Sequence, residues 1–198
     1  MNGRNSIGFG ALVLAAAVAA TAPLLVGCVP AVIAVGVGAG TLVAVDRRST
    51  GAQVDDQTIE FKVTTSAGTR FGDTIHLNVV SYNGLVLLTG EAPTIAVVDE
   101  IAQLARTTDR VRTVQNEMVI GPTADLASRS NDTVTTSKVK ARFVEADRFS
   151  ANFVKVVTER SVVYLMGIVS RHEADAAAQI ASTTAGVARV VKVFEYTN

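Results

Sequence analysis

The stretch Val79–Gly90, VVSYNGLVLLTG, recurs 77 residues later as Val156–Gly167, VVTERSVVYLMG. Each copy is a pair of apolar, β-branched runs separated by two residues. In the first copy these two residues are Asn83-Gly84, the favoured sequence of a two-residue hairpin turn. In the second copy they are Arg160-Ser161, so the hairpin there is predicted from the repeat. The stretch therefore predicts one β-hairpin in each half of the chain.

The repeat extends to both sides of the hairpins. Residues 103–111, QLARTTDRV, match residues 179–187, QIASTTAGV, with five of nine residues identical. Near the start of each copy stand Asp56 and Asp132, and each is predicted to cap a helix of about three turns. The chain is therefore predicted to divide into the following parts: a first domain at 55–121, a polar linker at 122–130 and a second domain at 131–198.

A second helix and a closing strand complete each copy. Alanine-rich segments with apolar residues at helical spacing predict helices at 94–107 and 171–183. The last strands are predicted at 112–120 and 189–196. Because the second helix connects strands two and three, these two strands are expected to pair in parallel through a right-handed crossover. The sequence thus predicts an α+β protein with two tandem αββαβ domains, each a three-stranded mixed sheet with two helices.

Composition excludes several kinds of function. The 198 residues include 18 basic and 18 acidic ones, so no net positive charge suggests nucleic-acid binding. A single cysteine and two histidines cannot form an intrachain disulfide or a Cys/His zinc site. We therefore expect no metal, no cofactor, no nucleic-acid partner and no small-molecule substrate.

The N-terminus predicts a membrane attachment. One charge, Arg4, precedes an uncharged run over residues 6–45 that is long enough to cross a bilayer. The run fits either a permanent anchor helix or a secretory signal over residues 1–27. Within it, Leu25-Val26-Gly27-Cys28 resembles the bacterial lipobox, and a cysteine buried in an apolar helix is the alternative.

The lipobox resemblance implies a covalent lipid anchor. In lipoproteins the cysteine thiol receives diacylglycerol, the signal is cut before the cysteine and the new amine is acylated. For this chain it implies a signal peptide over 1–27, acyl chains on Cys28 and a tether over 28–54. By analogy with such lipoproteins, Val29 after the cysteine indicates the outer membrane, with the protein facing the periplasm.

Three glycines of the apolar tether, Gly36, Gly38 and Gly40, look at first like a dinucleotide-binding fingerprint. The position of the third fingerprint glycine holds Thr41 instead, so the pattern fails. We expect residues 29–45 to lie against the membrane or to pack on the folded body.

Several features together resemble the BON-domain family. They are the helix-strand-strand-helix-strand order, the glycines that end strand two (Gly90 and Gly167) and the V-x-x-V pattern at 111–114 and 187–190. Two such domains behind a lipobox imply a lipoprotein of the outer membrane that binds anionic phospholipid. The resemblance further implies a protein that gathers at the division site and supports envelope integrity.

Charge is distributed unevenly between the two copies. Residues 55–121 hold five basic and nine acidic residues, whereas residues 131–198 hold nine basic and seven acidic ones. An anionic membrane is therefore expected to attract the second copy. In its first helix, Val139 and Phe143 are predicted to pack on the sheet, leaving another stripe free. The predicted phospholipid-binding residues on that free side are Val134, Lys138, Lys140 and Arg142.

A protein-interaction module and an enzyme are the two rival classes of function. A protein-interaction module is the alternative, with the acidic first domain docking on an envelope partner. Catalysis is not expected, because His76 begins a strand and His172 lies beside Glu173 in the first turn of a helix. The adjacent carboxylates Asp55-Asp56 and Asp99-Glu100 point apart on a helix and suit caps and surface charge better than paired catalysis.

Overall fold

The computed structural model describes residues 46–197. The predicted signal peptide, the predicted lipidation site Cys28 and residues 28–45 of the predicted tether lie outside these residues. In the described part of the chain, no helix has the length and apolar character needed to cross a bilayer.

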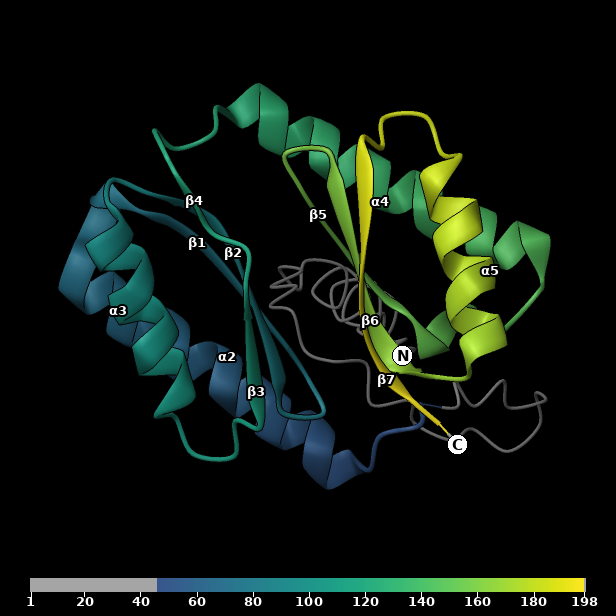
Figure 1. Cartoon of the computed structure of the whole chain (residues 1–198), viewed down its shortest axis with the longest axis horizontal. Coiled ribbons are helices and arrows are strands. Elements are labelled where there is room, and N and C mark those ends of the chain that lie inside the picture. Colours follow the sequence, from purple (N-terminus) through teal and green to yellow (C-terminus); the bar gives the residue numbers. More distant parts are fainter. Residues whose placement is uncertain (1–45, 198) are drawn as a thin grey trace, which may run out of the picture. The chain divides into compact units, whose positions relative to one another are not determined.

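The first unit follows the predicted order of elements (Figure 1). Its central strand β2 pairs antiparallel with β1 and parallel with β3 and β4, which confirms the predicted parallel pairing. The last strand is divided in two, because the side chain of Asn116 accepts a hydrogen bond from the Met118 amide and turns the chain. The elements are α2 (Thr50–Phe71), a 3-10 turn η1 (Gly72–Thr74), β1 (His76–Tyr82), β2 (Leu85–Ala92), α3 (Ile95–Arg106), β3 (Thr113–Asn116) and β4 (Val119–Ile120).

The second unit repeats this architecture with the strand order β5-β6-β7. Here β6 is central, antiparallel to β5 and parallel to β7. Both predicted hairpins and both predicted second helices are confirmed. The elements are α4 (Leu126–Ala146), a 3-10 turn η2 (Ala151–Phe153), β5 (Lys155–Glu159), β6 (Val162–Val169), α5 (Arg171–Ser182) and β7 (Arg189–Tyr196).

The predicted starts of the first helices were wrong. The cap of α2 is Ser49, whose hydroxyl accepts a hydrogen bond from the Ala52 amide. The cap of α4 is Asp125, which accepts from Ser128 at 2.7 Å. The end of the predicted tether and the second half of the predicted linker are therefore helical.

Asp56 and Asp132 hold the hairpin turns and do not cap helices. The Asp132 carboxylate accepts the amides of Arg160 and Ser161, both at 2.8 Å. The two turn residues have φ of +50° and +62°, the backbone of a two-residue type I′ turn, although neither is glycine. The carboxylate thus secures a turn whose own residues do not favour it.

In the first unit Asp56 makes the same contacts with the Asn83 and Gly84 amides, at 2.7 and 2.8 Å. It also accepts from Ser81 Oγ at 2.6 Å and from the Arg48 guanidinium at 2.9 Å. Burial by itself would raise the pKa of Asp56, but these hydrogen bonds outweigh burial and hold the pKa below its ordinary value. The ionised carboxylate is therefore the form that the fold selects.

Gly90 and Gly167 were predicted to end strand two, but β2 and β6 each continue two residues further, and a close approach of backbone explains both glycines. A Cβ at Gly90 would lie 2.0 Å from the carbonyl oxygen of His76, and one at Gly167 would lie 2.2 Å from that of Phe153. Only glycine fits at these two positions.

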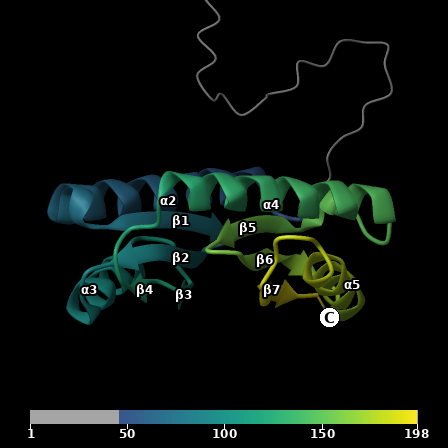
Figure 2. The same cartoon turned by 90° about the horizontal axis from the view of Figure 1, so that it is seen from above.

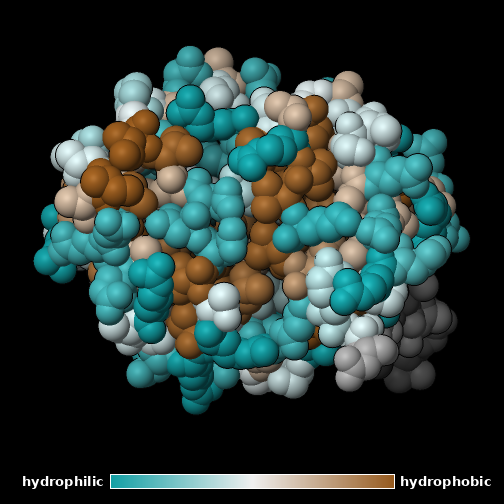
Figure 3. All heavy atoms as spheres, in the orientation of Figure 1, coloured by the Kyte–Doolittle hydropathy of each residue, from teal (hydrophilic) through white to brown (hydrophobic). Residues whose placement is uncertain are grey.

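The two sheets bury both of their faces. On β2, Val86 and Leu88 face the helices of their own unit, whereas Leu87 faces the other unit. Tyr164 and Met166 of β6 meet it there, as do neighbouring side chains of β1, β5 and β7. Figure 3 shows apolar side chains at the surface along the line where the two units meet. Figure 2 shows α2 and α4 at one edge of the sheets, beside β1 and β5, and α3 and α5 towards the opposite edge, beside β3, β4 and β7.

We predict that Asp132→Ala lowers the free energy of unfolding by about 2 to 3 kcal/mol, because it leaves two turn amides without their charged acceptor. Urea unfolding of residues 46–198 would measure the loss. The matched control is Asn131→Ala, an exposed neighbour on the same helix, which is expected to stay within about 0.5 kcal/mol of the wild type. Equal stability of the two variants would contradict this role of the carboxylate.

Candidate functional site

The side of α4 that faces away from its sheet is the part of the molecule to which the sequence assigned lipid binding. Its buried side chains recur at helical spacing and are Asp132, Thr135, Val139 and Phe143. Val139 and Phe143 pack in the core of the second unit, as predicted. The remainder of the helix is left for contacts outside the unit.

Three of the four predicted phospholipid-binding residues are accessible. Val134 is 51% exposed. Lys138 and Lys140 are exposed, and neither forms an ion pair within residues 46–197. The two ammonium groups therefore keep their full charge for an anion outside this part of the chain.

The fourth residue, Arg142, was predicted to be free for lipid, but its side chain is bonded within the protein. Its guanidinium donates to the Ile180 carbonyl at 2.9 Å and to the hydroxyls of Thr183 and Thr184 at 3.1 and 2.8 Å. These groups end α5, where helix carbonyls lack partners and the helix dipole favours a cation. Arg142 thus joins α4 to α5.

The equivalent helix of the first unit differs at the same positions. With an offset of 76 residues, Val134 and Lys140 correspond to Thr58 and Thr64 of α2. Lys138 corresponds to Lys62, whose ammonium lies 3.6 Å from the Asp109 carboxylate. Unpaired positive charge is therefore a property of α4.

One exposed aromatic residue was missed by the sequence analysis. Phe61 on α2 is 70% exposed. The available signal was its position outside the core stripe of Ile59, Val63 and Ala67, which recurs at helical spacing.

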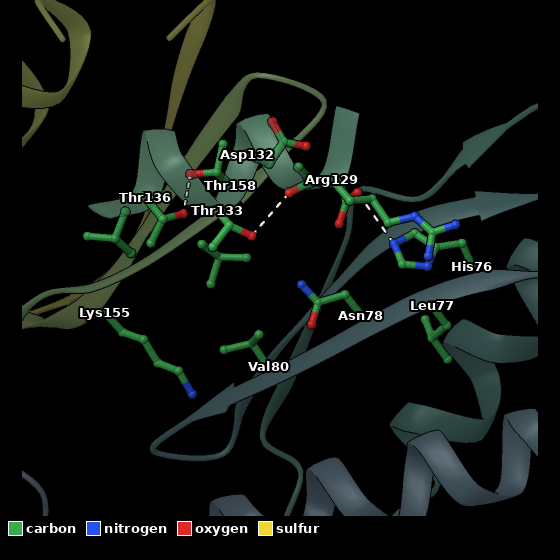
Figure 4. Close-up of a pocket in the computed structure, with 13 residues that line it drawn as sticks. His76, Leu77, Asn78, Val80, Arg129, Asp132, Thr133, Thr136, Lys155 and Thr158 are labelled. Carbon is green, nitrogen blue, oxygen red and sulfur yellow. Dashed lines mark hydrogen bonds and ion pairs between the residues drawn. The ribbon is translucent and has the colours of Figure 1, made fainter. Parts of the chain in front are cut away.

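A polar cleft of about 470 Å³ lies between β1, β5 and α4 (Figure 4). Asn78 points into it from β1, opposite the hydroxyls of Thr136 and Thr158, which bond to each other at 2.7 Å. Near one end His76 lies 3.6 Å from Glu159. The pKa of Glu159 is raised by burial, which outweighs the charge of His76. The polar side chains that line this cleft between the units therefore largely bond to one another.

A second cleft of about 400 Å³ shares Lys155 with the first. Lys140 and Val144 of α4 line one wall, and Arg48 and Tyr82 of the first unit also line it. The Lys155 ammonium is bound by Glu60 of α2 at 3.0 Å, so an ion pair joins the two units between the clefts.

The residues just before α2 bind both units. The Arg47 guanidinium makes two hydrogen bonds of 2.8 and 2.9 Å with Glu173 at the start of α5. It also lies over the Phe153 ring, 3.8 Å from its centre. Arg48 pairs with Asp56 of the first unit at 2.9 Å. The last part of the predicted tether is therefore fastened to the folded body.

Comparisons with known proteins agree with this architecture. The family model of the BON domain matches residues 55–122 and 131–198. The chain is 42% identical over 174 residues to the outer membrane lipoprotein DolP of Haemophilus influenzae, covering 87% of this chain and 90% of that protein. It is 37% identical to the 21 kDa hemolysin of Actinobacillus pleuropneumoniae, covering 77% and 79%.

A similar solved structure is that of CdsD, a structural protein of the type III secretion system of Chlamydia trachomatis. It is 14% identical, with 73% of this chain and 92% of that chain covered and a TM-score of 0.29. A score this low carries no argument about function.

We predict that the ion pair between Arg47 and Glu173, at the start of α5, makes the free energy of unfolding decrease at acidic pH. The Arg47 guanidinium lowers the pKa of Glu173 from 4.5 to about 2. Because the folded form has the lower pKa, the stabilisation is complete above pH 4.5 and is lost as the pH falls towards 2.

The variant Glu173→Gln keeps the capping box with Ser170 but loses the charge. Its deficit in unfolding free energy relative to the wild type should be largest near neutral pH and should vanish in acid. Asp175→Asn, at a fully exposed carboxylate on the same helix, is the control and should show a smaller deficit. A Glu173→Gln deficit that does not change with pH would contradict the assignment.

Proposed function

Because the chain belongs to the BON-domain family and carries two copies of the domain, we propose that it is an outer-membrane lipoprotein that binds anionic phospholipid. Held at the periplasmic surface of that membrane, it supports the integrity of the cell envelope at the division site. The lipobox-like sequence at Cys28 and the similarity to an outer membrane lipoprotein of Haemophilus influenzae support the compartment.

The observation that carries the lipid proposal is the exposed side of α4. Within the described part of the chain Lys138 and Lys140 form no ion pair there, and Val134 is exposed beside them. Lysines near an anionic leaflet each contribute about 1 kcal/mol, and an apolar side chain between them enters the boundary with the acyl chains. Arg142 supports this surface by fixing α4 to α5 and is left out of the lipid contacts.

The lipid anchor on Cys28 and the contact of α4 with the bilayer reinforce each other. A lipid-attached chain keeps its domains close to the bilayer, so even a weak contact of α4 is repeated at high effective concentration. The acyl chains hold the protein in the membrane, and α4 sets how the domains lie on it.

The alternative, docking of an envelope partner on the acidic first domain, stays a prediction. Two of the carboxylates in that domain, Asp56 and Glu91, are buried. Others, including Asp55 and Glu60, are paired with cations. The first domain therefore presents fewer unpaired carboxylates at its surface than its nine acidic residues suggest.

We predict that Lys138→Gln with Lys140→Gln weakens binding to phosphatidylglycerol vesicles about thirtyfold, because two contributions of about 1 kcal/mol are lost. Sedimentation of residues 46–198 with vesicles would measure it, and high salt should reduce wild-type binding. The matched control removes the same charge from the opposite side, through Arg106→Gln with Arg171→Gln, both exposed in α3 and α5. An equal loss in both double variants would refute a specific role for α4.

We predict that Cys28→Ala abolishes acylation and leaves an unprocessed precursor, because no other residue of the chain is a cysteine. Metabolic labelling with palmitate and the mass of the mature N-terminus would measure both effects. Normal labelling of the variant would show that the lipid is attached elsewhere.

A further inference from the structure

The side of the molecule that carries α4 also carries α2. Figure 2 shows the two helices together along one side of the sheets, with α3 and α5 along the other. The second cleft connects them, since its lining includes Arg48, just before α2, and Lys140 of α4. The parts of α2 and α4 that are exposed on this side therefore belong to one face, which we call the α2/α4 face.

On α2 the outward surface carries two large apolar side chains among polar ones and has no exposed carboxylate. Val54 is 57% exposed and Phe61 70%, and their spacing of seven residues puts them on one stripe. The three acidic residues of the helix are turned to other partners. Asp55 pairs with Arg110, Asp56 holds the hairpin turn, and Glu60 pairs with Lys155. The negative net charge of the first domain is therefore not located on the outward surface of α2.

On α4 two exposed apolar side chains stand on one side of the helix, one near each end. Leu126 is 77% exposed and Val144 69%. Lys140 lies between them at helical spacing, and Lys140 and Val144 line the cleft shared with the first unit. The exposed charged side chains of α2 and α4 together are Lys62, Arg70, Arg129, Lys138, Lys140 and Glu145. Lys62 and Arg70 pair with Asp109 and Glu100, whereas Lys138 and Lys140 form no ion pair within residues 46–197. The α2/α4 face thus combines large apolar side chains with unpaired positive charge on α4.

The opposite side has a different composition. On α3 and α5 the one large apolar side chain that is markedly exposed is Ile95, and the neighbouring strands β4 and β7 add Val119, Ile120 and Tyr196. Exposed basic residues there, such as Arg106 and Arg171, are matched by the exposed carboxylates Asp99 and Asp175. Apolar side chains are thus exposed on both sides, and the excess of exposed positive charge on α4 distinguishes the side that an anionic lipid surface attracts.

We propose that α2 is a second membrane contact, in which Phe61 and Val54 enter the lipid boundary while α4 binds through its lysines. Both domains then lie on the anionic leaflet with the α2/α4 face against it. The inference rests on the proposed function, because it adds a contact to the same lipid surface. The aromatic side chain supplies the larger apolar area, since burying a phenylalanine removes more surface from water than a valine does.

The test uses the full acylated chain in vesicles that contain equal parts phosphatidylglycerol and phosphatidylcholine. An environment-sensitive fluorophore is attached in turn to Phe61→Cys on α2, to Val144→Cys on α4 and to Gln103→Cys on α3. Cys28 is the only cysteine of the natural chain and carries the anchor, so each variant offers one free thiol. Emission wavelength and quenching by brominated acyl chains report contact with lipid.

We expect the labels at 61 and 144 to shift to shorter wavelength and to be quenched, while the label at 103 stays in water. In vesicles of phosphatidylcholine alone these responses should be lost. With the label at 144, the further change Phe61→Ser should reduce quenching, because Ser137 is the equivalent residue of α4 and the helix accepts it.

A label at 61 that stays in water while the label at 144 responds would overturn the second contact and leave the proposed function standing. If neither label responds, both fail. An equal response at 103 would show non-specific adsorption and would also overturn the inference.

Discussion

Two buried carboxylates hold the hairpin turns from which the rest of each unit is organised. Asp56 is 2% exposed and Asp132 6%, and each accepts the two amides of its turn. A buried carboxylate is costly without donors, and a tight turn leaves amides that need an acceptor, so each group satisfies the other. The same bonds fasten the first helix of the unit to the tip of its hairpin.

A hairpin held in this way has consequences for both sheets. Its second strand, β2 or β6, becomes the central strand, with a parallel neighbour on its other side. The helices of a unit cover one face of its sheet, and the second unit covers the other face through side chains such as Leu87 and Met166. With both sheet faces buried, the surfaces left for recognition are the outer sides of the helices, the clefts and the sheet edges.

The helix surfaces are not alike, although the two units share a fold. Lys138 and Lys140 are unpaired on α4, whereas the corresponding Lys62 of α2 has an acidic neighbour and Thr64 has no charge. In turn, α2 presents Phe61 where α4 presents Ser137. The two related helix surfaces therefore differ in kind, since α4 offers unpaired positive charge and α2 offers an exposed aromatic side chain.

The sequence by itself determined the repeat, the hairpins, the second helices and the parallel pairing, because local turn chemistry and side-chain period specify these elements. It also determined that Val139 and Phe143 face the core. Only the tertiary structure decided the partners of isolated polar groups. Asp56 and Asp132 looked like helix caps, and Arg142 looked free, because their acceptors and donors come from segments 25 to 42 residues away.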